Sequence, residues 1–436
     1  MLMGVVDSAM VGQIGAVPLA AVAFANNLLA LPLVFGLGLV SCVAVRVSQR
    51  AGAGEESQIA DVMRHALLLA FWASLALMGI VASASFFLDR FGQDAEVARQ
   101  SRSFFLIVGA SLLPLLISFC FKNLCEALGK PWIPTYVLLA TVPLNVLLNW
   151  ILIYGNLGAP ALGIEGAAIA TFLARLAGLF ILGIWVYRVG ELRAVMPQKW
   201  RAPLQMAQFA SLLQIGVPAG LQVLLEVGAF SFGAIMVGWM GAEPLAAHQI
   251  TLSLAATTFM LPLGLSVATS IRTAAAHGAQ DMKLARQIGF NALGISLGFA
   301  CLTALLFFFA GETLALQFVK PEDARVAQIA ATLLIVTAMF QIVDGLQVVA
   351  AGALRGLSDA TVPMICAFVA YWLVGLPLGY FLAFKNELGA VGIWSGLAVG
   401  LAFAAVVLVV RFGQKTGSQE QGERSKENVG SEKLEI

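Results

Sequence analysis

Apolar runs long enough to cross a lipid bilayer occupy most of this 436-residue chain. The hydrocarbon core of a bilayer is about 30 Å thick, and a helix needs about 20 apolar residues to cross it. A shorter apolar piece at 1–14 precedes eleven runs of this length. The predicted spans are 19–45, 66–88, 104–126, 133–154, 163–187, 209–239, 245–271, 288–310, 327–354, 361–384 and 389–411.

The composition agrees with a chain that lies in lipid. Hydrophobic residues make up 60% of it, charged residues only 11%, and the mean hydropathy is +0.90. A soluble domain carries about 25% charged residues. The sequence therefore predicts an all-α polytopic membrane protein whose main partner is the lipid bilayer. The net charge of +1 and the lack of a basic patch speak against a nucleic-acid partner.

Two further classes of feature are missing from the sequence. The chain opens inside an apolar run with no basic region before it, so we expect no cleavable signal. The cysteines lie in apolar segments without a CxxC or Cys/His spacing, and we interpret them as small apolar residues with no metal, disulfide or cofactor role. They are Cys42, Cys120, Cys125, Cys301 and Cys366.

The distribution of basic residues between alternate loops predicts the orientation in the membrane. One set of loops carries thirteen of them: Arg46, Arg50, Arg64, Lys122, Lys130, Arg188, Arg193, Lys199, Arg201, Arg272, Lys283, Arg286 and Arg355. The opposite set carries six: Arg90, Arg99, Arg102, Lys320, Arg325 and Lys385. Cytoplasmic loops are the richer in Lys and Arg. The polar C-terminal tail, 412–436, is on the richer side, so we expect it to be cytoplasmic, and its composition predicts disorder.

The chain repeats itself with one offset. MVGQIGAVPLAA at 10–21 matches MVGWMGAEPLAA at 236–247, an offset of 226 residues from Met10 to Met236. At the same offset, Arg46 matches Arg272, Gly52 matches Gly278 and Gly166 matches Gly392. Six spans separate the copies, so both have the same orientation. This predicts two six-helix bundles related by a pseudo-two-fold axis along the membrane normal.

The repeat also sets the predicted boundaries. We expect an N-lobe at 1–187, an interfacial cytoplasmic linker at 188–206, and a C-lobe at 207–411. The first helix of the C-lobe begins near Phe209, and its counterpart would begin before Met1. We therefore expect the first helix of the N-lobe to be incomplete in this sequence.

Three acidic residues interrupt the apolar helices. They are Asp7 in VVDSAMVG, Glu226 in LQVLLEVGAF and Asp344 in FQIVDGLQVV. An ionisable group inside a membrane helix costs at least a few kcal/mol, so each needs a partner or a function. One interpretation is a protonated acid in a helix–helix hydrogen bond. The other is the binding of Na⁺ or a proton, because burial favours the protonated carboxyl and oxygen ligands suit Na⁺.

Polar residues on two other helices extend the candidate set. Asn145 and Asn149 lie four residues apart on one helix face, where they either line a polar cavity with Asp7 or join helices. Thr171 and Arg175 share a face of the next helix, and Arg175 either snorkels towards water or neutralises an acid. His248 fits a hydrogen-bonded packing residue better than a functional one.

These residues resemble those of the multidrug and toxic compound extrusion (MATE) transporters, in their NorM-like bacterial branch. The resemblance covers essentially the whole chain. Its segments are VDSAMVGQIGAVPLAAV, GAEPLAAHQI, SVATSIRTAAAHGA, FQIVDGLQVVAAGALRGLSDATVP and YWLVGLPLGY. It implies twelve helices in two lobes, a C-lobe cation site at Glu226 and Asp344, and an N-lobe polar site at Asp7, Asn145 and Asn149 with Thr171 beside it.

The resemblance implies a secondary antiporter in a bacterial inner membrane. It would act as a monomer and export amphipathic, cationic drugs in exchange for Na⁺ or H⁺. A flippase for lipid-linked precursors is the alternative within a two-bundle fold, but it requires a cationic cavity, and the charges inside these helices are mostly acidic. An intramembrane enzyme would require a motif such as HExxH, and ATP-driven transport a P-loop; the sequence contains neither.

Overall fold

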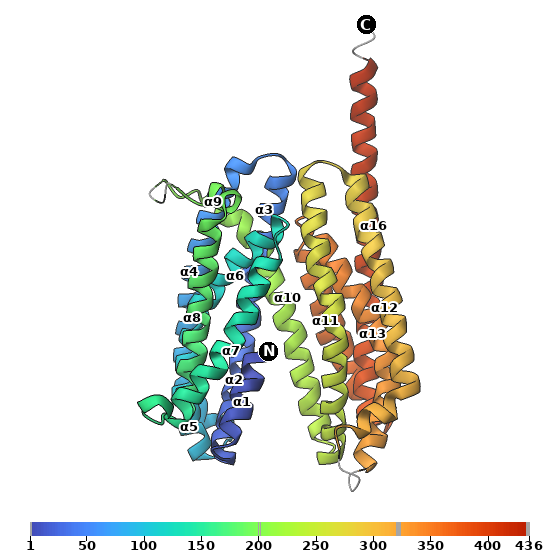
Figure 1. The fold of residues 1–436 in the computed structure, drawn as a ribbon. Coiled ribbons are helices and arrows are strands. Elements are labelled where there is room, and N and C mark those ends of the chain that lie inside the picture. Colours follow the sequence, from blue (N-terminus) through green and yellow to red (C-terminus); the bar gives the residue numbers. More distant parts are fainter. Residues whose placement is uncertain (1, 199, 201, 320–323, 433–436) are drawn as a thin grey trace. The chain divides into compact units, whose positions relative to one another are not determined.

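A computed structural model describes residues 2–198, 200, 202–319 and 324–432 of the chain (Figure 1). Within these residues the structure has eleven helices long and apolar enough to cross a membrane, and one short apolar helix near the N-terminus. These eleven correspond to the predicted spans. The fold class is therefore confirmed as an all-α polytopic membrane protein. Lys199, Arg201 and Lys320 of the loop count lie outside the described residues.

The helices fall into an N-terminal and a C-terminal series, joined between α9 and α10. The first series is α1 (Leu2–Gly12), α2 (Ala16–Val40), α3 (Cys42–Gly52), α4 (Glu56–Ala84), η1 (Ser85–Phe91), α5 (Ala95–Ala110), α6 (Leu112–Ala127), α7 (Trp132–Tyr154), η2 (Asn156–Gly158), α8 (Ile164–Arg188) and α9 (Gly190–Ala194). The second is α10 (Met206–Gly238), α11 (Ala242–Gly278), α12 (Met282–Leu316), α13 (Ala324–Gly356), α14 (Thr361–Ala367), η4 (Phe368–Gly375), α15 (Leu376–Tyr380), η5 (Phe381–Lys385) and α16 (Ala390–Glu432).

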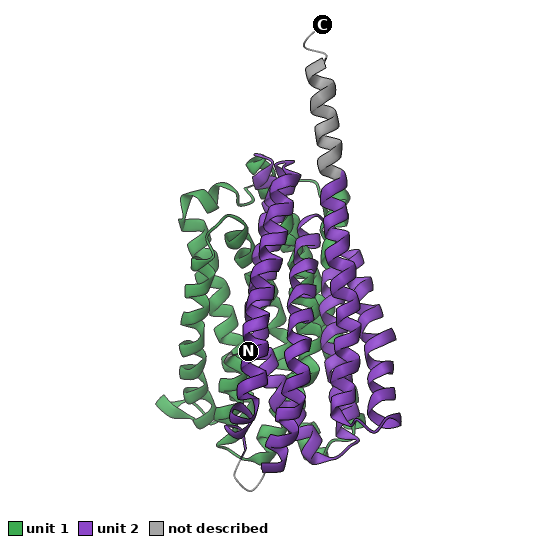
Figure 2. Ribbon diagram, turned by 90° about the vertical axis from the view of Figure 1, so that its right-hand side faces the viewer, with its two compact units in different colours: residues 1–47, 55–216 green, residues 48–54, 217–436 purple. Residues whose placement is uncertain are grey.

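The chain divides into two compact units (Figure 2). Unit 1 contains residues 1–47 and 55–216, and unit 2 contains residues 48–54 and 217–436. The division differs from the predicted lobe boundaries in two places. The first eleven residues of α10, 206–216, belong to unit 1, and the short segment 48–54 at the end of α3 belongs to unit 2. The predicted lobe boundaries were drawn between spans, so they could not place part of a helix in the other unit.

The internal repeat is present in the backbone as well as in the sequence. Gly15 precedes α2 with a φ of 146°, and Gly241 precedes α11 with a φ of 114°. Gly163 and Gly389 have φ values of 56° and 57°. Each pair is 226 residues apart. Because positive φ strains residues that carry a Cβ, glycine at both copies indicates that the same turn is built twice.

Glycines at equivalent positions also let helices approach each other closely. A Cβ on Gly166 of α8 would overlap the Leu152 carbonyl of α7. A Cβ on Gly392 of α16 would lie 2.5 Å from the Ala383 nitrogen of η5. Both neighbours are backbone atoms, which cannot turn aside as a side chain can. Gly166 and Gly392 of the sequence repeat therefore each mark a close approach to the preceding membrane-spanning segment of their unit.

We expect Gly392→Ala to destabilise the protein by about 1–3 kcal/mol, because the added methyl group overpacks a backbone contact. Thermal unfolding of the purified protein in detergent measures the effect. Gly298→Ala in α12 is the matched control, since a Cβ there meets no atom within 4 Å. The control should hold or raise the melting temperature, as alanine favours a helix over glycine. Equal melting temperatures for the two variants would contradict this account of the contact.

The segment between the two series is held against unit 1. Arg64 of α4 donates to the carbonyl oxygens of Ala202 and Pro203, at 2.8 and 3.0 Å. Lys130, in the loop before α7, pairs with Glu191 of α9, and its ammonium lowers the pKa of that carboxyl below the usual range. The predicted linker thus contains a short helix, α9, and is tied to unit 1 by charged groups. Its position at the membrane surface stays a prediction.

The C-terminal tail differs from its prediction. We expected disorder from residue 412, whereas α16 continues to Glu432 without a break. Phe412 and Thr416 are fully buried, and Arg411 pairs with Asp359 at 2.8 Å. Polar composition alone suggested disorder, but the apolar face around Phe412 still has a helix bundle to pack against. The prediction of disorder beginning at 412 is therefore wrong.

Candidate functional site

The first candidate residue, Asp7, lies on α1, which packs on α7, α8 and α2. Tyr154 at the end of α7 donates its hydroxyl to the Met10 carbonyl at 2.8 Å and to Gln13 Oε1 at 3.0 Å. These bonds hold α1 along α7. Asp7 lies about one helical turn before Met10, so its side chain reaches the buried face of α7.

Four predicted polar residues of unit 1 meet in one buried cluster, which we call the Asp7 cluster. Asn149 Nδ2 donates to Asp7 Oδ1 at 2.7 Å, and Thr171 Oγ1 donates to Asp7 Oδ2 at 2.6 Å. Asn145 Nδ2 lies 3.3 Å from both Asp7 Oδ1 and Thr171 Oγ1. All four side chains are at most 2% exposed. Each Asp7 oxygen thus accepts from a neutral donor, an arrangement that stabilises a carboxylate within the bundle.

Arg175 on α8 is a cationic residue close to the Asp7 cluster. It lies one turn after Thr171, and its charge interacts with that of Asp7. Its Nη1 donates to Ser111 Oγ at 2.7 Å, where α5 ends and α6 begins. Of the two interpretations of Arg175, neutralisation of an acid agrees with this placement. When both groups are ionised, Asp7 and Arg175 together carry no net charge.

The two acids of unit 2 also come together. Glu226 lies on α10 and Asp344 on α13, and their carboxyl groups are close enough for their charges to interact. Asp344 is 5% exposed, and its Oδ1 has no hydrogen-bond partner among the described residues. Rings from the same two helices pack together beside them, with the centroids of Phe230 and Phe340 5.9 Å apart. We call Glu226 and Asp344 the acid pair.

Two residues that sequence reasoning missed lie near the acid pair. Arg355, counted above as a loop residue, is in the last turn of α13, and its charge interacts with that of Glu226. Tyr371 lies in the π-helical segment η4, is 1% exposed, and interacts with both acids. Its ring is 5.9 Å from that of Phe230. π-Helical turns often occur at functional sites, but the apolar sequence around Tyr371 carries no signal for one.

His248 is a packing residue in this structure. Trp394 Nε1 donates to His248 Nδ1 at 3.1 Å, and the ring centroids are 5.6 Å apart. Because Nδ1 accepts this hydrogen bond, the imidazole is neutral in the arrangement shown. This agrees with the expectation for His248.

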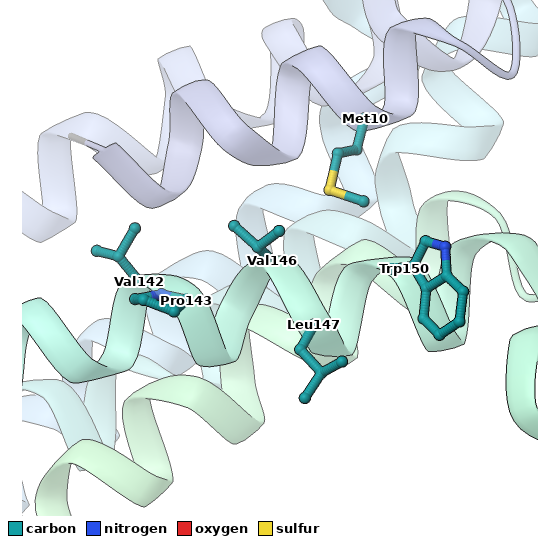
Figure 3. Close-up of a pocket in the computed structure, with 6 residues that line it drawn as sticks. All are labelled: Met10, Val142, Pro143, Val146, Leu147 and Trp150. Carbon is teal, nitrogen blue, oxygen red and sulfur yellow. The ribbon is translucent and has the colours of Figure 1, made fainter.

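An apolar pocket lies between α1 and α7 of unit 1 (Figure 3). Met10 of α1 lies across from side chains of α7, and Trp150 is at one end. The exposed residues Val146 and Leu147 alternate along α7 with the buried Asn145 and Asn149. One helix thus presents amides to the interior and an apolar surface to the outside. The pocket is lined by Met10, Val142, Pro143, Val146, Leu147 and Trp150.

Two units of membrane-spanning helices, with an internal repeat and acidic groups buried in each unit, define a polytopic membrane transport protein. The family model for MatE matches residues 1–151 and 218–381, and the chain belongs to this family. It is 34% identical to Probable multidrug resistance protein NorM of Agrobacterium fabrum over 411 residues, 93% of this chain and 88% of that protein. It is 31% identical to Multidrug resistance protein NorM of Aliivibrio fischeri, over 94% of this chain and 89% of that protein.

Solved structures share the fold at lower sequence identity. The MATE transporter VcmN of Vibrio cholerae, in its bent form, superposes with a TM-score of 0.86 at 22% identity, over 96% of this chain and 93% of that one. A MOP superfamily transporter from Pyrococcus furiosus gives a TM-score of 0.87 at 18% identity, over 96% and 92%. These likenesses confirm the two-lobe all-α fold implied by the sequence resemblance.

Proposed function

We propose that this protein is a secondary antiporter of a bacterial inner membrane. It exports amphipathic, cationic drugs in exchange for inward movement of Na⁺ or H⁺. Membership of the family and the multidrug-resistance names of relatives across nearly the whole chain support drug efflux. Both units are within one chain, so we propose that a monomer carries out the exchange. The excess of basic residues in alternate loops supports a cytoplasmic C-terminus.

The acid pair is the observation that carries the coupling to a cation. Two carboxylates that interact inside an apolar bundle repel each other, and desolvation penalises both charges. Arg355, in the last turn of α13, supplies one positive charge that interacts with Glu226. With both acids ionised, Glu226, Asp344 and Arg355 sum to one negative charge, so a single monovalent cation makes the group neutral. Na⁺ and H⁺ both meet this requirement.

Unit 1 has a different charge balance. Asp7 and Arg175 already neutralise each other, and neutral donors satisfy the Asp7 carboxylate. We therefore assign the driving cation to the acid pair and propose the Asp7 cluster as a polar site for the drug. The apolar pocket between α1 and α7 suits the hydrophobic part of an amphipathic molecule. Because each ligand favours a different state of the lobes, cation binding and drug binding oppose each other, as exchange requires.

Transport by the purified protein in proteoliposomes tests this function. Uptake of a fluorescent organic cation such as ethidium is followed under a Na⁺ gradient, a pH gradient or no gradient. One of the two gradients should drive transport, and collapse of that gradient with an ionophore should stop it. Transport that requires ATP, or that neither gradient drives, would refute the proposal. Movement of a fluorescent lipid between leaflets, with no drug transport, would favour the flippase alternative.

A further inference from the structure

Two buried glutamines of unit 2 carry amide atoms without a hydrogen-bond partner among the described residues. Gln222 on α10 is 2% exposed and Gln347 on α13 is 1% exposed. Gln222 Oε1 and both amide atoms of Gln347 have no hydrogen-bond partner among the described residues. Burying an amide without a hydrogen bond costs about 1–3 kcal/mol on protein scales, so such groups normally bind water or a ligand. The position of the two glutamines in the bundle indicates which ligand they bind.

The glutamines form a row next to the acid pair. On α10, Gln222, Glu226 and Phe230 are spaced by four residues, which places them on one helix face. On α13, Phe340, Asp344 and Gln347 are spaced by four and three residues and also share a face. Phe230 contacts Phe340, so these two faces meet. Two membrane-spanning helices, α11 and α12, lie between α10 and α13, and α10 and α13 therefore run antiparallel.

In both helices the order towards the Gly356 end of α13 is the same: aromatic ring, acid, amide. Successive rows are about 4.5–6 Å apart along the helix axis, because each helical residue rises 1.5 Å. The aromatic end is closed by packed rings, with Phe340 5.4 Å from Trp394 and Phe230 5.9 Å from Tyr371. The amide end continues towards Arg355. On the Gly356 side the acid pair is followed by unpartnered amide atoms, whereas on the other side the Tyr371 hydroxyl and His248 Nε2, also without a partner among the described residues, lie among these packed rings.

We propose that Gln222 and Gln347, which we call the amide row, form a neutral second subsite through which the coupling cation passes between the acid pair and the Gly356 end of α13. This inference rests on the proposed function, in which the acid pair binds that cation. Amide oxygens are suitable ligands for Na⁺ and suitable acceptors for the water that carries a proton. A neutral site holds a cation more weakly than the acids do. The ion can thus leave the acid pair stepwise, as conduction through several weak sites requires.

The route ends on the side that we place in the cytoplasm, because the Gly356 end of α13 precedes a loop of the basic set. An ion arriving at the acid pair from the other side of the membrane is therefore released inward past the amide row. Arg355 stands beyond the row and interacts with Glu226. The positive charge of Arg355 repels cations that approach the amide row from the Gly356 end. The row is therefore occupied by an ion that has come from the acid pair.

The first test separates passage from binding. Gln222→Leu, Gln347→Leu and the double variant keep the side-chain size but remove the amide. In proteoliposomes we expect gradient-driven drug transport by the double variant to fall about tenfold or more, while equilibrium affinity for the coupling cation stays within about threefold, since the acids remain. The melting temperature in detergent should be unchanged or higher, because an unpartnered buried amide has been removed. Undiminished transport, or equal losses of transport and affinity, would overturn the proposal.

A second test measures the accessibility of the amide row from each side of the membrane and does not depend on drug transport. In a background with the five native cysteines replaced, Gln347→Cys is treated with a membrane-impermeant thiosulfonate from each side. We expect modification from the side carrying the Gly356 end of α13, and protection at saturating Na⁺ or low pH. Val349→Cys, on the same helix but in an apolar cluster, is the matched control and should stay unmodified. Equal protection of both cysteines from the reagent would refute the route. If the parent protein couples no cation, the proposed function fails, while this accessibility still decides whether the row is hydrated.

Discussion

Asp344→Asn is expected to abolish ion-driven drug export. The variant removes one negative charge, so Glu226 and Arg355 remain as a neutral pair with no requirement for a further cation. An interaction with a charged group is worth about 1.5–3 kcal/mol, so the loss of one charged ligand lowers the cation affinity by about 10–150-fold. Resistance of an efflux-deficient host to a cationic drug, together with ethidium transport in proteoliposomes, measures the effect. Glu226→Gln should behave in the same way unless Arg355 is left without its partner and the protein is destabilised.

Glu312→Gln is the matched control for the acid pair. Glu312 is an exposed acid on α12 of the same unit, and its substitution also removes one carboxylate charge. We expect resistance and transport to stay within about twofold of the parent, because surface substitutions seldom change stability by more than about 0.5 kcal/mol. Melting temperatures in detergent verify that all variants are folded. Drug resistance that persists in a folded Asp344→Asn variant would remove the basis for cation coupling at the acid pair.

The second large effect is expected at a pair of glycines related by the repeat. In unit 2, a Cβ on Gly52 would overlap the Ala275 carbonyl, and a Cβ on Gly278 would overlap the Gln49 carbonyl. These positions correspond at the offset of 226, so the end of α3 and the end of α11 cross with equivalent residues in contact. Gly52→Val or Gly278→Val should disfavour this arrangement by about 1–3 kcal/mol, which corresponds to about 5–150-fold in its population.

Transport in proteoliposomes should fall accordingly, and by a similar factor for Gly52→Val and Gly278→Val, because the two contacts are equivalent. The matched control is Gly264→Val on α11, where a Cβ meets no atom within 4 Å. The control should transport at close to the parent rate. A large loss at one glycine with none at the other would show that the crossing is not used symmetrically. Parent-like transport by both variants would show that the contact is dispensable.

Several elements were predictable because the membrane restricts what a sequence can do. Apolar runs of about 20 residues leave a helix as the only segment that satisfies its own backbone in lipid, so the spans followed from composition and length. The repeat was visible because both copies keep the same turn glycines, such as Gly15 and Gly241. Acids at positions 7, 226 and 344 stood out because charge is rare in such helices.

Other features depended on contacts between segments far apart in the chain. Arg355 was counted with a loop, although it lies in the last turn of α13. Its charge interacts with that of Glu226 on α10. Tyr371 has apolar neighbours in sequence, and it lies within electrostatic range of both acids because η4 packs beside Phe230. Gln222 and Gln347 are one turn from the acids, so helical spacing could have singled them out. Only the tertiary structure showed that Gln222 Oε1 and both amide atoms of Gln347 are buried without a partner among the described residues.

The sequence by itself determined that the chain spans a membrane in two related halves, that three acids lie inside those halves, and that the chain resembles a family of drug exporters. Hydropathy, residue spacing and the repeat are local or linear properties, and they need no coordinates. The tertiary structure alone decided which charges meet: Asp7 with Arg175, and Glu226 with Asp344 and Arg355. The physical reason is that the electrostatic energy of a buried group depends on the distance to its neighbours, and helix packing sets that distance.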